Sequence, residues 1–197
     1  MRRMCCAMAA MILLASTPSR ADEEERDHGE WRERLRTLLP KMGHRNWIVV
    51  ADSAYPSQTA QGIETIVTGE DHLKVLRQVM AELAKQRHVR PVVYLDKELA
   101  FVPENHARGI ESFRQRLHDV LDEREVHTLP HEEIIARLDK TGATFHVLVL
   151  KTNLTLPYTS VFFELDCGYW GAEGEKALRE AMKASDGEKL PKQERGP

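Results

Sequence analysis

Short apolar runs rich in β-branched residues alternate along this chain with longer segments of helical periodicity, and this alternation limits the possible folds more than any other feature. The runs are too short for free-standing helices and indicate buried strands at Trp47–Ala51, 91–96, 144–150 and 160–165, with shorter candidates at 63–67 and 125–129. Apolar residues at helical spacing predict helices over 30–39, 73–83, 110–121, from Pro130 to just before Gly142, and over 175–184. Strands that alternate with helices predict an α/β domain with a central, largely parallel sheet flanked by helices.

The first 21 residues have the layout of a secretory signal peptide. Arg2 and Arg3 form a basic start, residues 7–15 an apolar middle, and residues 19–21 (Ser-Arg-Ala) a small-x-small cleavage site. The alternative is an ordinary frayed N-terminus. The two cysteines at 5–6 come too early for lipid attachment at the cleavage point, so we expect an exported protein, periplasmic or secreted, rather than a lipoprotein.

The remainder of the chain divides into three parts. Residues 22–30 are acidic and polar and indicate a flexible leader, whereas 31–170 carry the strand and helix patterns of one domain. Residues 171–197 form a charged tail that is predicted to be partly helical and then disordered. After removal of residues 1–21, Cys167 would be the one cysteine left, which excludes an internal disulfide and a cysteine metal site.

The charge balance argues against nucleic acid as a partner. The chain has 28 basic and 31 acidic residues, and loss of residues 1–21 removes three arginines, which leaves a net charge of about −6 and no basic patch. Beyond residue 21 no apolar run approaches the roughly 20 residues that a membrane helix needs. No glycine-rich phosphate-binding motif is present, so the sequence does not imply a nucleotide cofactor.

The segment 41–56 holds the first two candidates for chemistry. His44, in a Gly-His turn before the strand Trp47–Ala51, is suited to proton transfer near neutral pH, or is a hydrogen-bonded loop histidine. Asp52 follows the strand at its carboxyl end, where open α/β sheets bind ligands, or else it makes a turn with the following amides. Across an extended strand the two residues lie about 26 Å apart, at roughly 3.3 Å per residue. They can serve one site only if the chain bends or a second subunit supplies the partner.

Two further candidates lie in the second half of the chain. His131 stands at the start of a predicted helix, whose dipole favours the neutral ring, or it is a solvent-exposed first-turn residue. Tyr158 follows Pro157 just before a strand and can donate a hydrogen bond or stack on a ring, or it is a rim aromatic. His127 and His131 are four residues apart, but Pro130 interrupts the helix that would place both on one face, so we expect no metal site.

Several motifs resemble the D-ribose pyranase and L-fucose mutarotase family of sugar-handling proteins. They occur in the family's order and approximate spacing: Leu-Pro-Lys-Met-Gly-His at 39–44, Ile-Val-Val-Ala-Asp-Ser-Ala-Tyr-Pro at 48–56, Gln-Gly-Ile-Glu-Thr-Ile-Val-Thr-Gly at 61–69, Thr-Leu-Pro-His-Glu-Glu-Ile at 128–134, and Pro-Tyr-Thr-Ser-Val-Phe-Phe at 157–163. The resemblance covers about residues 31–168.

This resemblance implies a fold, an assembly and a site. It implies a homo-oligomeric ring with a monosaccharide site at the subunit interface and no cofactor. By position, His44 would be the general acid/base, with Asp52 and His131 as polar partners around the sugar and Tyr158 in contact with it. Ser160 stands where members usually carry Asn, and its hydroxyl can still bind a sugar hydroxyl, with shorter reach.

The chemistry implied is opening and reclosing of a cyclic hemiacetal. One proton leaves the anomeric hydroxyl and one reaches the ring oxygen, tasks that an imidazole and a second donor can share. We therefore expect an exported sugar mutarotase or pyranase-like isomerase. The alternatives are a non-catalytic carbohydrate-binding protein on the same fold, and a structural ring whose tail recruits another protein.

Overall fold

A computed structural model describes residues 20–122 and 124–186. Along the chain it contains, in order, α1 (Arg20–Leu38), η1 (Leu39–Lys41), β1 (Trp47–Ala51), β2 (Ile63–Val67), α2 (His72–Leu83), β3 (Val89–Asp96), η2 (Lys97–Phe101), α3 (Ile110–Leu121), β4 (Val126–Leu129), α4 (His131–Gly142), β5 (Val147–Lys151), β6 (Val161–Cys167) and α5 (Ala172–Asp186). Most of the expected signal peptide and the end of the expected tail, residues 1–19 and 187–197, lie outside the described residues.

The six strands form one sheet in the order β2-β5-β1-β6-β3-β4. β2 pairs parallel with β5, β5 with β1, and β3 with β4, whereas β6 runs antiparallel to both of its neighbours, β1 and β3. The predicted α/β class and largely parallel sheet are thus confirmed, with one reversed strand near the middle. That strand joins a β2-β5-β1 half to a β3-β4 half.

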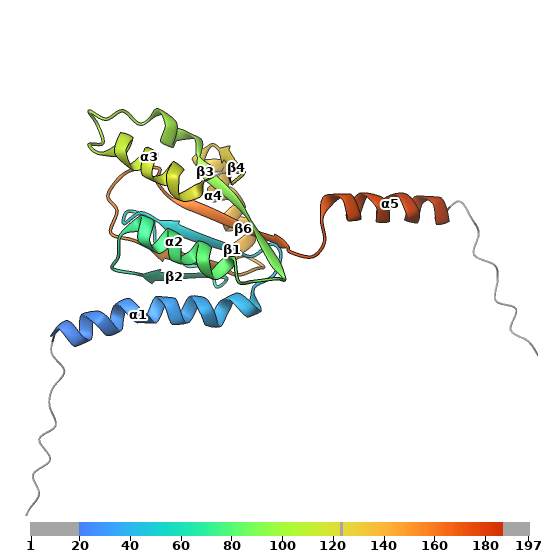
Figure 1. Cartoon of the computed structure of the whole chain (residues 1–197), viewed down its shortest axis with the longest axis horizontal. Helices are drawn as coiled ribbons and strands as arrows, with labels where there is room; N and C mark the ends of the chain where they lie inside the picture. Colours follow the sequence, from blue (N-terminus) through green and yellow to red (C-terminus); the bar gives the residue numbers. More distant parts are fainter. Residues whose placement is uncertain (1–19, 123, 187–197) are drawn as a thin grey trace, which may run out of the picture.

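Helices cover both faces of the sheet, which explains why the central strands are continuously apolar. One core cluster joins α1, α2 and α3 to the first face, and a second joins α4 to the other. β1 contributes to both: Ile48 and Val50 point into the first cluster, whereas Val49 and Ala51 point into the second. All five residues of β1 are buried, as the sequence predicted. Figure 1 shows α1, α2 and α3 spread across one side of the sheet.

α1 begins at Arg20, ten residues before the helix that the apolar spacing predicted. Residues 22–30, expected as a flexible leader, form its first turns, consistent with the high helix propensity of Ala, Glu and Arg. Trp31 and Leu35 are fully buried against the body. The apolar spacing located the packed half of this helix but not the half that precedes it.

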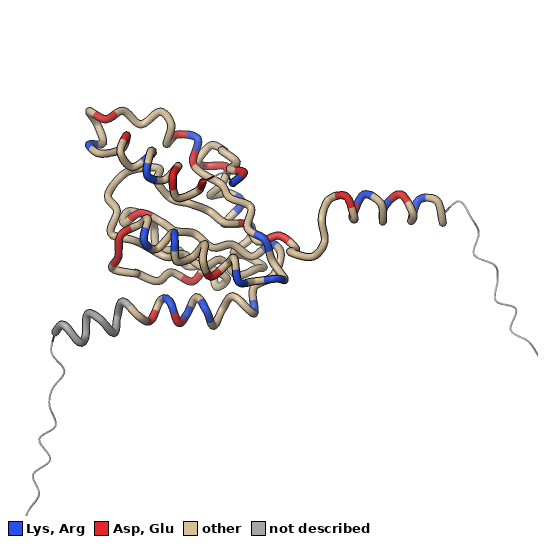
Figure 2. Tube along the Cα trace, in the orientation of Figure 1, with Lys and Arg blue, Asp and Glu red and all other residues tan. Residues whose placement is uncertain are grey.

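α5 projects away from the body on a short connection after β6 (Figure 1). Tyr169, Trp170, Leu178 and Met182 are exposed on this extension. Figure 2 shows acidic and basic residues interspersed along α5 and over the body, without a broad region of one sign. Among the described helices, none is long and apolar enough to cross a membrane.

Candidate functional site

Polar side chains gather at the carboxyl end of the parallel strands. Asp52 follows β1, Asp96 ends β3 and Thr152 follows β5, while the reversed strand β6 brings the segment 158–160 to the same end. β4 leads through Pro130 directly into His131, the first residue of α4. Five strands thus deliver polar groups to one edge of the sheet, where open α/β folds bind ligands.

Asp52 and Ser160 are held together at this edge. The Ser160 hydroxyl donates to Asp52 Oδ2 at 3.2 Å, and the Ala54 amide donates to Asp52 Oδ1 at 2.8 Å. The turn that was the alternative reading of Asp52 is therefore present, and the carboxylate engages Ser160 as well. Ser160 is buried and Asp52 is half-buried, so the hydrogen bond between them lies at the inner side of the cluster.

His131 and Tyr158 form a second contact. Their rings meet edge to face, with centroids 5.6 Å apart and an interplanar angle of 80°. Tyr158 is 40% exposed and has a φ of 55°, in the left-handed region that bulky residues rarely adopt. A strained residue of this kind persists where the surrounding structure requires it, often at a functional site. In this backbone conformation the phenol of Tyr158 lies beside the ring of His131.

Asp96 lies directly behind His131. The two side chains approach to 3.1 Å between His131 Nδ1 and Asp96 Oδ1, and Asp96 is 2% exposed. Burial raises the pKa of Asp96 to about 6, although His131 opposes the rise, and the charges of Glu98 and Asp52 add to it. Asp52 and Asp96 are therefore electrostatic neighbours within one polar cluster.

Glu98 of η2 holds the start of α4 in place. Both of its carboxylate oxygens accept from the His131 amide, at 3.1 and 3.0 Å. Amides of the first helical turn have no partner within the helix, and a carboxylate is favoured at that end of the dipole. Glu98 thus takes the role of a cap, because the preceding Pro130 has no side-chain donor or acceptor to serve as one.

A buried histidine supports the floor of this cluster. His72 Nδ1 lies 3.0 Å from Thr152 Oγ1, which itself donates to the Ala51 carbonyl at 2.8 Å. Burial lowers the pKa of His72 to about 4, against smaller opposing effects of Asp52 and Asp71, so the ring is neutral at pH 7. This neutral ring ties α2 to the ends of β1 and β5.

Tyr55 closes the cluster from the loop after β1. Its ring is buried, and its hydroxyl makes no hydrogen bond among the described residues. Burial, with the charges of Asp139, Asp96 and Asp52, raises its pKa, so the phenol stays protonated. A protonated hydroxyl among carboxylates is a hydrogen-bond donor.

His44 lies at the other end of the sheet. It is exposed in the turn before β1, and the next amide, that of Arg45, donates to the carbonyl of Leu165 near the end of β6. Its charge contributes to the lowered pKa of Asp166, after the larger effect of a hydrogen bond from Arg90. The structure therefore brings together Asp52, His131, Tyr158 and Ser160 but separates His44 from them. The chain does not bend to unite them.

Three members of the cluster, Asp96, His72 and Tyr55, did not emerge from sequence reasoning. Asp96 had a usable signal, since it ends a predicted strand as Asp52 does. His72 resembled an ordinary residue at the start of a predicted helix, and its burial depends on the packing of α2. Tyr55 stood in a loop whose course no periodicity describes.

A groove of about 640 Å³ between η2, α3 and β4 shares Asp96 with this cluster. The rest of its lining is mainly apolar, with groups such as Leu99, Leu117 and Leu121, so it suits a sugar less well than the cluster does. Within the part of the chain that the structure describes, no group of three or more His, Cys, Asp or Glu side chains is arranged to hold a metal ion.

Comparison with known proteins identifies the family. Residues 29–167 match the RbsD / FucU transport protein family. The chain belongs to this family. The D-ribose pyranase of Levilactobacillus brevis is 26% identical over 133 residues, which cover 66% of this chain and 88% of that protein. The predicted resemblance is confirmed.

Two solved structures are similar to this chain. Bacillus subtilis RbsD complexed with D-ribose is 21% identical, with a TM-score of 0.45. The fucose mutarotase from Streptococcus pneumoniae, in complex with L-fucose, is 17% identical, also with a TM-score of 0.45. Each comparison covers 68% of this chain and 91% of the other. The family match ends at Cys167, so α5 extends beyond it.

Proposed function

We propose that this protein is a monosaccharide isomerase of the mutarotase or pyranase type, which interconverts anomers or ring forms by general acid/base catalysis. Family membership and the likeness to a D-ribose pyranase support a sugar substrate. The observation that carries the proposal is the polar cluster in which Asp52 bonds Ser160 and His131 meets Tyr158. Carboxylate, hydroxyl, imidazole and phenol groups are the types that bind sugar hydroxyls and move their protons.

His44 enters the proposal through a second copy of the chain. In one chain it lies at the amino end of β1 and the cluster lies at the carboxyl end. We place the complete site at an interface in a homo-oligomer, where His44 of one copy faces the cluster of the next. The N-terminal segment further leads us to propose that the protein is exported, to the periplasm or outside the cell.

Saturation-transfer NMR on ribose, fucose, galactose and glucose tests the activity. Wild-type protein should accelerate exchange between anomer or ring-form signals of at least one sugar. His131→Ala and His44→Ala should each lose that acceleration, because each removes a proton-transfer group worth roughly 10²- to 10⁴-fold. His118→Ala is the matched control, since that side chain is 81% exposed on α3. Line broadening without exchange would identify a carbohydrate-binding protein instead.

Mixing the two inactive variants tests the shared site. When His44→Ala and His131→Ala are unfolded and refolded together, about a quarter of head-to-tail interfaces should pair an intact His44 with an intact cluster. Activity should then return to about that fraction of wild type. A monomer in light scattering, or no recovery in the mixture, would refute the interface site.

A further inference from the structure

Asp96 is a buried carboxylate that the fold does not satisfy with hydrogen bonds among the described residues. It is 2% exposed, and neither of its oxygens makes a well-formed hydrogen bond among the described residues. A buried charged group without hydrogen bonds is costly, and an apolar or amide side chain would fit the end of a strand at lower cost. Its retention at the polar cluster points to a task in that cluster.

The surroundings of Asp96 identify its partner. His131 of α4 approaches it to 3.1 Å, whereas Glu98 of η2 and Asp52 after β1 act on it only as like charges that raise its pKa. Tyr55, from the loop after β1, is a neutral phenol, because burial and the charges of nearby carboxylates, Asp96 among them, raise its pKa. Of these four neighbours, His131 is the one that can carry a positive charge.

The orientation of His131 is set on two sides. Its amide is bonded to Glu98, which places the start of α4. Its Nδ1 is buried, lies 3.1 Å from Asp96 Oδ1 and makes no well-formed hydrogen bond among the described residues, although the side chain as a whole is 31% exposed. The imidazole therefore turns Nδ1 inward to Asp96 and leaves its other edge, which carries Nε2, toward the open side next to Tyr158.

We infer that Asp96 is a positioning residue that holds His131 with a proton on Nδ1 and a free electron pair on Nε2, directed at the bound sugar. This inference rests on the proposed isomerase function and deepens it. It makes His131, rather than His44 alone, a proton acceptor of the reaction. Asp96 acts through His131 and does not touch the sugar.

The proton transfers balance in both directions. Nε2 takes the proton of the anomeric hydroxyl, whose oxygen–hydrogen electron pair becomes the second bond of the carbonyl. The bond from the anomeric carbon to the ring oxygen breaks, and that oxygen keeps its electron pair and takes a proton donated by the imidazolium of His44 in the neighbouring copy, which becomes neutral. Ring closure reverses each step, so that Nε2 gives its proton back to the sugar and His44 regains its own. Throughout, the Asp96 carboxylate stabilises the imidazolium that forms beside it.

Asp96→Asn tests the inference, because it keeps the side-chain shape and removes the charge. The kcat for sugar exchange should fall about 10- to 100-fold, part of what a general base supplies, with KM nearly unchanged and the melting temperature equal or higher. Asp119→Asn, which removes an exposed carboxylate on α3, should leave kcat unchanged. In a His131→Ala background, Asp96→Asn should add no further loss, since its effect passes through the ring.

A second readout works without any sugar. In wild-type protein labelled with ¹⁵N-histidine, the shifts of His131 should report a protonated Nδ1 and a bare Nε2, and Asp96→Asn should change them. Unchanged shifts, an unchanged kcat, or a kcat loss that parallels a loss of folded protein would overturn the role of Asp96. If wild-type protein accelerates no sugar, the isomerase proposal fails, and the ¹⁵N shifts still decide whether Asp96 positions His131.

Discussion

Two buried titratable residues next to the site have opposite effects on stability between pH 4 and 6.5. Asp96 has a pKa raised from 3.8 to about 6, so the folded protein binds its proton more tightly than the unfolded chain does. Its contribution is fully present below pH 3.8 and is lost as pH rises through about 6. His72 has a pKa lowered from 6.5 to about 4, so its contribution is present above pH 6.5 and is lost as pH falls through about 4. The pH dependences of these two contributions to the free energy of unfolding largely cancel in the wild-type protein.

Asp96→Asn should therefore reveal the pH dependence of the free energy of unfolding that His72 causes. At pH 7.5 the variant should be about 1–3 kcal/mol more stable than wild type, since it no longer buries a carboxylate. Its free energy of unfolding should rise from pH 4 to 6.5, where that of wild type stays comparatively flat. Urea unfolding at pH 4.0, 5.0, 6.0 and 7.5 measures both. A variant less stable than wild type at pH 7.5 would show that Asp96 serves the fold.

At the scale of the secondary-structure elements, Glu70 attaches α1 to the body. It accepts from Trp31 Nε1 at 3.2 Å and from Arg32 Nη2 at 2.8 Å, and Lys74 Nζ lies 2.8 Å away. Burial alone would raise its pKa, but these partners together lower it to about 2. The residue stands between β2 and α2, so one carboxylate connects α1 with both.

Glu70→Gln should loosen α1. The amide keeps the shape but loses the charge, and the expected cost at pH 7 is about 1–3 kcal/mol. Glu70 contributes stability that is present above pH 4.5 and is lost as pH falls through about 2, so the difference from wild type should shrink at pH 2 to 3. Urea unfolding at pH 7 and 3 provides the comparison. Glu33→Gln, an exposed change on the same helix, is the control.

Most elements could be predicted from the sequence, but not their arrangement. β1 has the predicted bounds, and α3 begins and ends where the apolar spacing placed it. The insertion of β6 between β1 and β3 could not be predicted, because strand order depends on contacts that no local pattern records. The site was predicted in part. Asp52 and His131, at a strand end and a helix start, were found, whereas Asp96 was missed although it ends a strand, and the burial of His72 depends on the packed structure.

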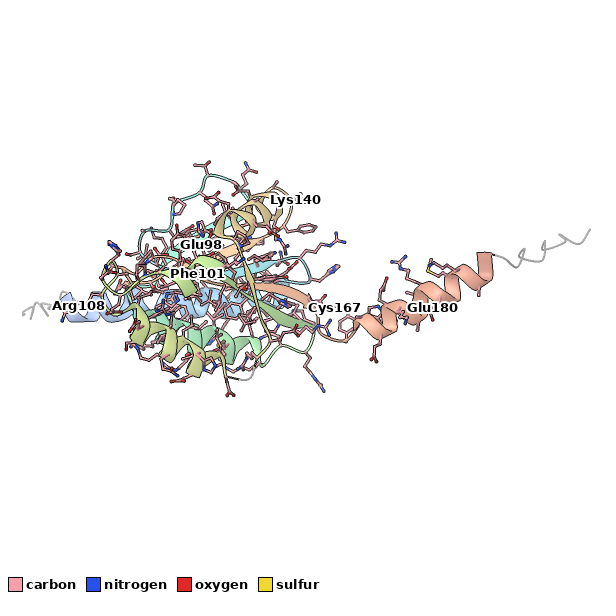
Figure 3. The ribbon with its side chains drawn as sticks, turned by 90° about the horizontal axis from the view of Figure 1, so that it is seen from above. Glu98, Phe101, Arg108, Lys140, Cys167 and Glu180 are labelled. Carbon is pink, nitrogen blue, oxygen red and sulfur yellow. The ribbon has the colours of Figure 1, made fainter. Side chains whose placement is uncertain are left out.

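At the scale of the whole molecule, the two ends of the sheet differ in character. The polar cluster occupies one end, and α5 leaves from the other, after Cys167. In Figure 3 Cys167 lies at the end of the body from which α5 projects, and Glu98, which caps the helix of the site, lies well away from it. The polar cluster and the extension therefore lie at opposite ends of the sheet.

Truncation after Gly171 should leave the body intact. α5 lies outside the family match and its large apolar side chains are exposed, so its removal takes little packing from the core. The melting temperature should change by no more than about 2 °C, in line with the small effects of surface changes. Circular dichroism with thermal melting measures this, and a shortened protein that melts more than about 10 °C lower would contradict it.

The position of β6 has a consequence for the order of folding. This strand is the last of the six to be synthesised, yet it is the one that joins the β2-β5-β1 half to the β3-β4 half. A ribosome-bound chain that lacks residues 161–167 can hold two separate half-sheets but cannot complete either core. The domain therefore acquires its native structure only after nearly all of it has been synthesised. For a chain that is proposed to be exported across a membrane, this late completion of the fold prolongs the time during which the chain is unfolded.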